Sequence, residues 1–407
     1  MVVPISDNPP APSPKANAAR RFYVPQLDGL RFFAFLLVFV HHGPRLSSLF
    51  SPGSVLAKPF FFLEGFGWCG VDLFLVLSAF LITSLLLIEY EKHHDISLRG
   101  FYLRRILRIW PLYYLVSVIG FLLLPAIGIY AMPWGSAAHL DLLKKHLIPY
   151  VTLFGNFSSG HYSYPGVPTL AHLWTVTLEE QFYIAWPFLL SLLLPRRRVA
   201  LWTVLAVLLG GTISLRFALM GRAPHPYIWT HTLARLDPLI VGIAIAMWRY
   251  ARPASTGWRM PAVKLTLGLV LVGLVPLGGP IEAQSINILW QFLATALGFG
   301  LVLDAILGRE TNPFAWLLSQ RPFVWLGKLT YGLYVYHVLG LQFGESVVAF
   351  GQRHLGWPGT GWSLVLRSLT SLIVTILVAA VSYRFFESYF LRLKDRFARV
   401  HSRPVDR

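Results

Sequence analysis

Arg31 and His42 stand eleven residues apart in the first long apolar stretch of the chain, LDGLRFFAFLLVFVHH. An α-helix turns by about 100° per residue, so the two side chains share one helix face, about 16 Å apart along the axis. Ionisable groups are costly in lipid, and inside a spanning helix they line a protein interior or a water-filled path. A histidine at that depth is suited to proton transfer with a substrate.

Three further apolar segments bring ionisable groups to a similar depth, namely Glu179, Asp237 and His337. A histidine beside a carboxylate is a recognisable general base, because the carboxylate fixes the tautomer and stabilises the imidazolium. His42 with Glu179 or Asp237 fits that description. Two other interpretations stay open: such groups can hold helices together, or His41 and His42 can bind a metal with the carboxylates. Neighbouring histidines on a helix point about 100° apart and chelate poorly, so we expect no metal.

A second group of cations begins the third apolar segment, in RGFYLRRILRIWP. Arg104 and Arg108 share a helix face and Arg105 flanks them, at a predicted membrane boundary where guanidinium groups suit phosphates through paired hydrogen bonds. The alternative is plain anchoring at the cytoplasmic surface. We interpret the loop run Arg196–Arg198 as anchoring alone. The chain has no glycine-rich phosphate loop, so direct use of a nucleoside triphosphate is not expected.

The composition indicates an integral membrane protein. Of 407 residues, 55% are hydrophobic and only 13% are charged, against about 25% charged in a soluble domain. The net charge of +17 comes from basic residues spread over many short loops. That pattern is typical of membrane orientation rather than of nucleic-acid binding, which we do not expect. The single cysteine, Cys69, excludes an internal disulfide and a multi-cysteine metal site.

Hydropathy predicts an all-α, polytopic fold of about ten transmembrane helices. Apolar runs of spanning length lie at roughly 25–44, 69–88, 106–127, 172–194, 199–219, 232–249, 262–279, 287–306, 327–346 and 364–386. The more polar segment 140–155 is expected at the membrane interface. Most of the 35 lysines and arginines fall on the side that holds the termini, so both termini are predicted to be cytoplasmic.

The chain divides into three predicted parts. Residues 1–22 are rich in proline and are expected to form a disordered cytoplasmic tail. The transmembrane domain is predicted to run over 23–392, and 393–407 is predicted to be a basic cytoplasmic tail.

Seven sequence blocks in a fixed order resemble the acyltransferase-3 family of integral membrane O-acyltransferases. The blocks are LDGLRFFAFLLVFVHH (27–42), GVDLFLVLSAFLIT (70–83), FYLRRILRIWPLYY (101–114), HLWTVTLEEQFYIAWP (172–187), RLDPLIVG (235–242), LGKLTYGLYVYH (326–337) and YRFFES (383–388). One block alone would be weak, whereas seven in the expected order are a specific signal. The resemblance extends over about residues 25–392.

The resemblance implies a reaction and roles for residues. Such proteins take an acyl group from cytoplasmic acyl-coenzyme A to a hydroxyl of an acceptor at the outer face, usually a glycan, a glycolipid or another cell-envelope molecule. By resemblance, Arg31 and His42 are the functional pair of the first helix, and the arginine block contacts the coenzyme A phosphates. A further motif corresponds to Trp174, Thr175 and Glu179, with Glu179 as its functional carboxylate.

The chain departs from the family pattern in a few places. Ala79 replaces the usual glycine after Ser78, where a close backbone approach is expected. Thr175 replaces a common serine and keeps the hydroxyl. His41 stands beside His42, but only His42 has the eleven-residue spacing. The soluble hydrolase-like domain fused to some relatives is not found, so we expect the chain to complete the transfer itself or to hand over to a separate protein.

We therefore predict an enzyme of the inner (plasma) membrane, a multi-pass O-acyltransferase that uses acyl-coenzyme A as co-substrate and transfers acetyl or another short acyl group. Its expected partners are acyl-coenzyme A, an envelope glycan or lipid acceptor, and membrane lipids. The residues expected to be catalytic are His42, Arg31, Glu179 and Asp237. Those expected to bind coenzyme A are Arg104, Arg105 and Arg108. Those expected to bind substrate are Trp174, Thr175, His337, Asp72 and Ser78. The rival is a transporter or exporter of an envelope lipid or glycan that uses these charges as a proton relay. An assembly scaffold is a weaker option.

Overall fold

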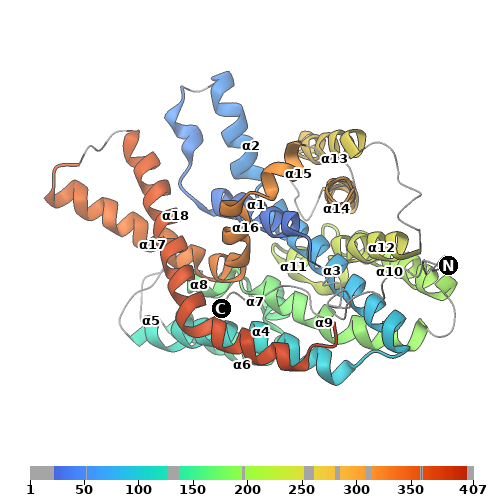
Figure 1. Ribbon diagram of the computed structural model, residues 1–407. Coiled ribbons are helices and arrows are strands. Elements are labelled where there is room, and N and C mark those ends of the chain that lie inside the picture. The colour runs from blue at the N-terminus through green and yellow to red at the C-terminus, as the bar shows by residue number, and fades with distance from the viewer. Residues whose placement is uncertain are drawn as a thin grey trace, which may run out of the picture.

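A computed structural model describes residues 23–51, 53–126, 137–194, 198–251, 261–279, 285–308, 313–357, 359 and 361–400. This part of the chain is built from helices and contains no β-strand, which confirms the predicted all-α class (Figure 1). The predicted tail 1–22 and the last seven residues of the predicted tail 393–407 lie outside the described residues.

The helices fall into long elements and short connecting ones. The long helices are α1 (Pro25–His42), α3 (Cys69–His93), α4 (Leu98–Val118), α6 (Ala137–Val151), α9 (Trp174–Leu193), α10 (Arg198–Leu219), α12 (Asp237–Ala251), α13 (Pro261–Leu274), α14 (Asn287–Ile306), α17 (Thr330–His354) and α18 (Trp362–Ser382). The short ones are α2 (Lys58–Phe66), α5 (Leu124–Ala126), α7 (Gly155–Tyr162), α8 (Pro168–Ala171), α11 (Tyr227–Thr230), α15 (Pro313–Leu318), α16 (Arg321–Lys328) and α19 (Ser388–Lys394).

The predicted spans coincide with helices, but only some of these helices are, by length and mean hydropathy, clear membrane spans. Within the described ranges, six helical segments are long and apolar enough to cross a membrane: Cys69–His93, Leu98–Ala126, Val199–Leu219, Pro261–Gly278, Asn287–Ile306 and Trp362–Phe397. The other predicted spans correspond to α1, α9, α12 and α17. Of these four, α12 is only 15 residues long, and α1, α9 and α17 carry Arg31, Glu179 and His337. The count of ten spans and the side of the termini stay predictions.

α1 and α3 pack together at the centre of the molecule and, with their neighbours, position the site. α1 packs against α3, α16 and α17, and α3 also contacts α9 and α12 (Figure 1). The approach of α1 to α16 depends on Gly327, because a Cβ there would lie 2.0 Å from the carbonyl oxygen of Asp28. The core face of α1 is apolar, with Phe35 and Val38 fully buried. This packing fixes the positions of the side chains at the two ends of α1.

Ala79, which replaces a glycine of the family pattern, packs against a glycine from another helix. A Cβ on Gly242 of α12 would lie 2.8 Å from the Cβ of Ala79 and 2.3 Å from the carbonyl oxygen of Val76. α3 and α12 therefore approach each other closely at Gly242 of α12.

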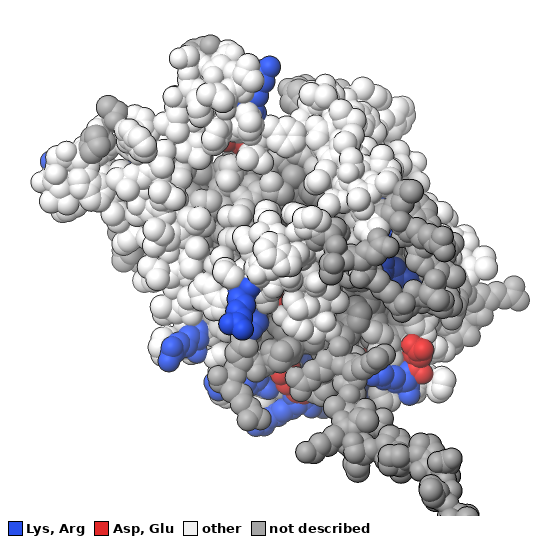
Figure 2. Space-filling view, turned by 45° about the horizontal axis from the view of Figure 1, so that its top comes forward, with Lys and Arg blue, Asp and Glu red and all other residues white. Residues whose placement is uncertain are grey.

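The C-terminal segment returns along α4. α19 and the following turn Asp395–Phe397 contact α4 along the lower edge of the molecule (Figure 1). Figure 2 shows that lysine and arginine gather in the lower part of that view, below a broad surface with few charges. An uncharged surface beside a basic rim is typical of a membrane protein.

Candidate active site

Two cavities open towards opposite ends of α1. The first, here called the arginine cavity, is lined by Arg31, Arg105, Arg108 and Lys328 and by the carboxylates of Asp28 and Glu179. The second, here called the histidine cavity, is lined by His41, His42, His172 and His225 and by several aromatic side chains. The eleven-residue spacing on α1 therefore separates Arg31 and His42 into different cavities.

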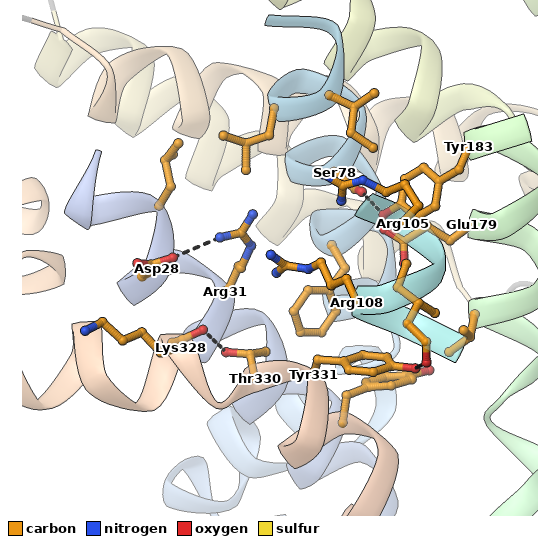
Figure 3. A pocket seen from close by; sticks show the side chains of 18 of the residues that line it. Asp28, Arg31, Ser78, Arg105, Arg108, Glu179, Tyr183, Lys328, Thr330 and Tyr331 are labelled. Carbon is orange, nitrogen blue, oxygen red and sulfur yellow. Dashed lines mark hydrogen bonds and ion pairs between the residues drawn. The ribbon is translucent and has the colours of Figure 1, made fainter. Parts of the chain in front are cut away.

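The arginine cavity is narrow and strongly cationic. Its volume is about 160 Å³. Arg31 is paired with Asp28, with 2.9 Å between Nη1 and Oδ1. Arg108 makes no hydrogen bond or ion pair with any described residue, and Figure 3 shows its guanidinium directed towards that of Arg31. Like charges that face each other across a cavity repel, so this arrangement favours a bound anion.

Two more cations, Arg105 and Lys328, line the arginine cavity. The guanidinium of Arg105 lies over the rings of Phe101 and Tyr183, 5.5 and 5.4 Å from their centroids. Cation–π contacts of this kind hold a guanidinium in place while leaving its N–H groups free to bind. Lys328 also lines the cavity, although the sequence analysis counted it only towards membrane orientation. Its place in the block LGKLTYGLYVYH was the signal that could have identified it.

Arg104 does not belong to this cavity, which corrects the sequence-based grouping. Its Nη1 donates to the carbonyl oxygen of Phe397 at 2.6 Å, and its Nη2 lies 3.5 Å from the buried carboxylate of Glu89. α4 turns Arg105 and Arg108, which are three residues apart, towards the cavity. Arg104 instead ties the C-terminal segment to α3 and α4.

Glu179 lies in the arginine cavity rather than beside His42. The hydroxyl of Tyr183 donates to Glu179 and lies 2.5 Å from Oγ of Ser78, so the three side chains form a chain of hydrogen bonds (Figure 3). His42 lines the histidine cavity and shares no hydrogen bond with Glu179. The predicted contact between His42 and Glu179 is therefore wrong. Ser78, expected near the substrate, does line the arginine cavity.

Asp237 and Asp72 are held in buried ion pairs. Arg216 binds both carboxylate oxygens of Asp237, at 2.7 and 2.8 Å, and Arg235 pairs with Asp72. All four side chains are almost inaccessible, and neither aspartate lines either cavity. Arg216 engages both oxygens of Asp237, whereas Arg235 engages only Oδ1 of Asp72 and leaves its Oδ2 without a hydrogen-bond partner among the described residues. In the structure these pairs link α10 to α12 and α3 to the residues just before α12. The catalytic role of Asp237 and the substrate-binding role of Asp72 stay predictions.

The histidine cavity is much larger, with a volume of about 760 Å³. Nδ1 of His42 lies 2.9 Å from the carbonyl oxygen of Val38. A carbonyl only accepts, so Nδ1 carries the proton and Nε2 is left as the basic nitrogen. His41 uses its Nδ1 in the same way on the carbonyl of Glu64, at 2.7 Å. Both residues line the cavity, and His42 is exposed to it.

Two further histidines stand behind His42. The ring centroid of His337 lies 5.1 Å from that of His42 and 4.7 Å from that of His172. His337 is buried and lines neither cavity, and its predicted contact with substrate stays a prediction. His172 lines the histidine cavity, and sequence reasoning missed it although it begins the block HLWTVTLEEQFYIAWP. Among the described residues, no group of three or more His, Cys, Asp or Glu side chains is arranged to hold a metal ion.

The two cavities meet at Thr175. Thr175 lines both cavities, and its Oγ1 lies 2.6 Å from the hydroxyl of Tyr334. Trp174 lines only the histidine cavity. Of these two residues of the predicted substrate-binding set, only Thr175 therefore lies at the junction of the two cavities.

The fold and these cavities define a multi-pass α-helical membrane protein with a cationic pocket and a histidine-lined pocket inside one bundle. Residues 24–384 match the model of the acyltransferase domain of the acyltransferase-3 family. The chain belongs to this family, as its sequence blocks predicted.

Similar proteins carry names that refer to O-acetylation. The chain is 29% identical over 385 residues to a putative peptidoglycan O-acetyltransferase YrhL of Bacillus subtilis, covering 90% of this chain and 54% of that protein. It is 25% identical over 403 residues to the peptidoglycan O-acetyltransferase OatA of Listeria monocytogenes, covering 92% and 58%. It is 29% identical over 383 residues to the O-acetyltransferase OatA of Staphylococcus aureus, covering 90% and 57%. The chain thus spans a little over half of their length. No solved structure matches it.

Proposed function

We propose that this protein is an O-acyltransferase of the plasma membrane. It takes a short acyl group, acetyl above all, from cytoplasmic acyl-coenzyme A in the arginine cavity and passes it to a glycan hydroxyl in the histidine cavity. The observation that carries the proposal is the meeting of a narrow cationic cavity and a wide histidine-lined cavity inside one helix bundle. The family and the names of its relatives agree with it.

The donor is inferred from the shape and charge of the arginine cavity. Coenzyme A carries phosphates at one end and a thin pantetheine arm at the other. Arg31, Arg105, Arg108 and Lys328 offer cations for the phosphates, and arginine binds phosphate oxygens through paired hydrogen bonds. A cavity of about 160 Å³ suits a narrow arm better than a bulky acceptor. The cavity lies at the N-terminal end of α1, the end that the sequence assigns to the cytoplasm.

The acceptor is inferred from the histidine cavity. Its described lining includes the indole rings of Trp68, Trp174 and Trp229 and the amide of Gln291, and includes no Lys, Arg, Asp or Glu. Flat apolar rings with a few polar groups suit the faces and hydroxyls of sugar rings. Because relatives are named peptidoglycan O-acetyltransferases, we propose peptidoglycan, or a related envelope glycan, as the acceptor.

His42 is proposed as the general base. Its Nε2 takes the proton of the acceptor hydroxyl as the hydroxyl oxygen bonds to the thioester carbonyl carbon. The C–S bond then breaks, and the proton passes to the coenzyme A thiolate. A transient acyl-imidazole on His42 is the two-step variant of the same reaction. Arg31 is about 16 Å from His42 along α1, so it acts on the donor and not on the histidine.

The transporter alternative is not favoured by the placement of the buried carboxylates. A proton relay needs titratable groups in sequence along a path. Asp72 and Asp237 are instead sealed in ion pairs with arginines. Arg31, Arg105, Arg108 and Lys328 line one cavity together, which fits anion binding.

Release of coenzyme A from acetyl-coenzyme A by the purified protein, with soluble peptidoglycan fragments as acceptor, tests the proposal. Mass spectrometry of the fragments detects the ester. Wild type should turn over, releasing coenzyme A continuously, only with acceptor present, and His42→Ala should abolish transfer at normal membrane levels; a single equivalent released without acceptor would indicate the two-step variant. His41→Gln is the matched control and should retain most activity. A wild-type protein that releases no coenzyme A, or an active His42→Ala variant, would overturn the proposal.

A further inference from the structure

Three residues separate the two cavities. Val71 of α3, Thr175 of α9 and Tyr334 of α17 are the only described residues that line both. We call this trio the partition. Each comes from a different long helix, so the width of the passage depends on how these helices pack.

The partition is closed by hydrogen bonds. The hydroxyls of Thr175 and Tyr334 lie 2.6 Å apart, so one donates to the other. The carbonyl oxygen of His172 lies 3.0 Å from Oγ1 of Thr175 and 3.2 Å from the hydroxyl of Tyr334. It accepts a hydrogen bond from whichever hydroxyl does not donate to the other. The ring of Tyr334 also packs edge-on against Phe74, with 5.7 Å between centroids. The hydroxyls of Thr175 and Tyr334 are thus engaged with each other and with a backbone carbonyl oxygen.

We infer that the partition determines the length of the acyl group that this enzyme transfers. The inference rests on the proposed function. The acyl carbonyl must stand where a thioester from the arginine cavity and a hydroxyl near His42 both reach it, which is the junction of the cavities. The acyl tail then lies against Val71, the methyl group of Thr175 and the ring of Tyr334. Each methylene beyond acetyl has to displace one of these groups.

The volumes of the two cavities support this position for the tail. The arginine cavity measures about 160 Å³ and must hold the pantetheine arm, so it has little room for a longer chain. The histidine cavity measures about 760 Å³, but the acceptor has to occupy it next to His42. An acyl group that moves from the arginine cavity to a hydroxyl beside His42 has to pass the three residues that line both cavities. The partition is therefore the place where chain length is limited.

Two substitutions widen the passage while leaving its hydrogen bonds in place. Thr175→Ser removes one methyl group and keeps the hydroxyl that binds Tyr334. Val71→Ala removes two methyl groups from a side chain that makes no hydrogen bond. The matched controls are Thr330→Ser and Val176→Ala, because these residues line the arginine cavity but not the partition. The hydroxyl of Thr330 also donates a hydrogen bond to a backbone carbonyl oxygen, that of Gly327, at 2.9 Å.

The experiment measures kcat/KM for acetyl-, propionyl- and butyryl-coenzyme A with soluble peptidoglycan fragments as acceptor. Wild type should prefer acetyl. One methylene in an apolar pocket changes selectivity by about 10- to 200-fold, so the butyryl-to-acetyl ratio should rise about tenfold or more in Val71→Ala. The propionyl-to-acetyl ratio should rise similarly in Thr175→Ser. Both controls should keep the wild-type ratios.

The outcomes separate selectivity from packing. A partition that only packs helices would lower all three rates together, leaving the ratios unchanged, and that result would overturn the inference. Equal shifts of these ratios in the control variants would also overturn the inference. So would a wild type with the same kcat/KM for butyryl- and acetyl-coenzyme A. Failure of the proposed function looks different, because wild type would then release no coenzyme A from any of the three donors.

Discussion

Arg108→Ala should weaken binding of coenzyme A, whereas Arg104→Ala should not. The two arginines lie one helical turn apart on α4, and both were expected from the sequence to bind phosphate. The structure separates them. Arg108 faces Arg31 in the arginine cavity and makes no hydrogen bond or ion pair with a described residue, while Arg104 binds Phe397 and Glu89.

The expected magnitude follows from the contacts that each variant loses. A hydrogen bond between a charged donor and a phosphate contributes about 1.5–3 kcal/mol. At about 1.4 kcal/mol for each factor of ten, Arg108→Ala should raise the Kd for coenzyme A roughly 10- to 150-fold. Without ligand, loss of Arg108 relieves repulsion with Arg31, so thermal stability should stay the same or rise. Arg104→Ala should instead lower thermal stability, because the carboxylate of Glu89 loses a cation.

Isothermal titration calorimetry in detergent measures both variants against coenzyme A and against pantetheine, which lacks the phosphates. Wild type and Arg108→Ala should bind pantetheine equally, since Arg108 is proposed to contact only phosphate. Equal losses of coenzyme A affinity in the two variants would contradict a specific phosphate contact by Arg108 and would favour plain membrane anchoring for both arginines. A loss of pantetheine affinity in Arg108→Ala would show that the variant disturbs the cavity itself.

Three further predictions concern stability. Asp237→Asn leaves Arg216 buried without its counter-charge, which should cost about 3–5 kcal/mol and lower the yield of folded protein in size-exclusion chromatography; normal yield would contradict this role. Burial lowers the pKa of His146 to about 4 from its ordinary value of 6.5, so the unfolded chain takes up a proton first and wild type should lose stability as the pH falls from about 6.5 towards 4. The gap in melting temperature between wild type and His146→Gln should therefore shrink between pH 7.5 and pH 5; a constant gap would refute it. Gly327→Ala places a Cβ 2.0 Å from a backbone oxygen of α1 and should destabilise the fold, whereas Gly210→Ala, with no atom within 4 Å, should be neutral or stabilising; equal melting temperatures would remove the argument from close packing.

Part of the site follows from the sequence because it depends on one helix at a time. Arg31 and His42 lie on one continuous helix, so their separation and shared face were predictable from the helical repeat. The all-α class followed from hydropathy and the family from the order of the sequence blocks. The same blocks contain His172 and Lys328, which line the cavities, but a residue type inside a block does not reveal which way its side chain points.

The rest depends on how the helices pack, which the spacing along one helix does not specify. Asp237 was expected to face His42, but α10 brings Arg216 against it and seals it in an ion pair. Glu179 lies at a depth that suited His42, yet the rotation of α9 turns it into the arginine cavity. The partition exists only where α3, α9 and α17 converge. A single helix sets the direction of each side chain relative to its own axis, and only the tertiary structure decides which neighbour stands in that direction.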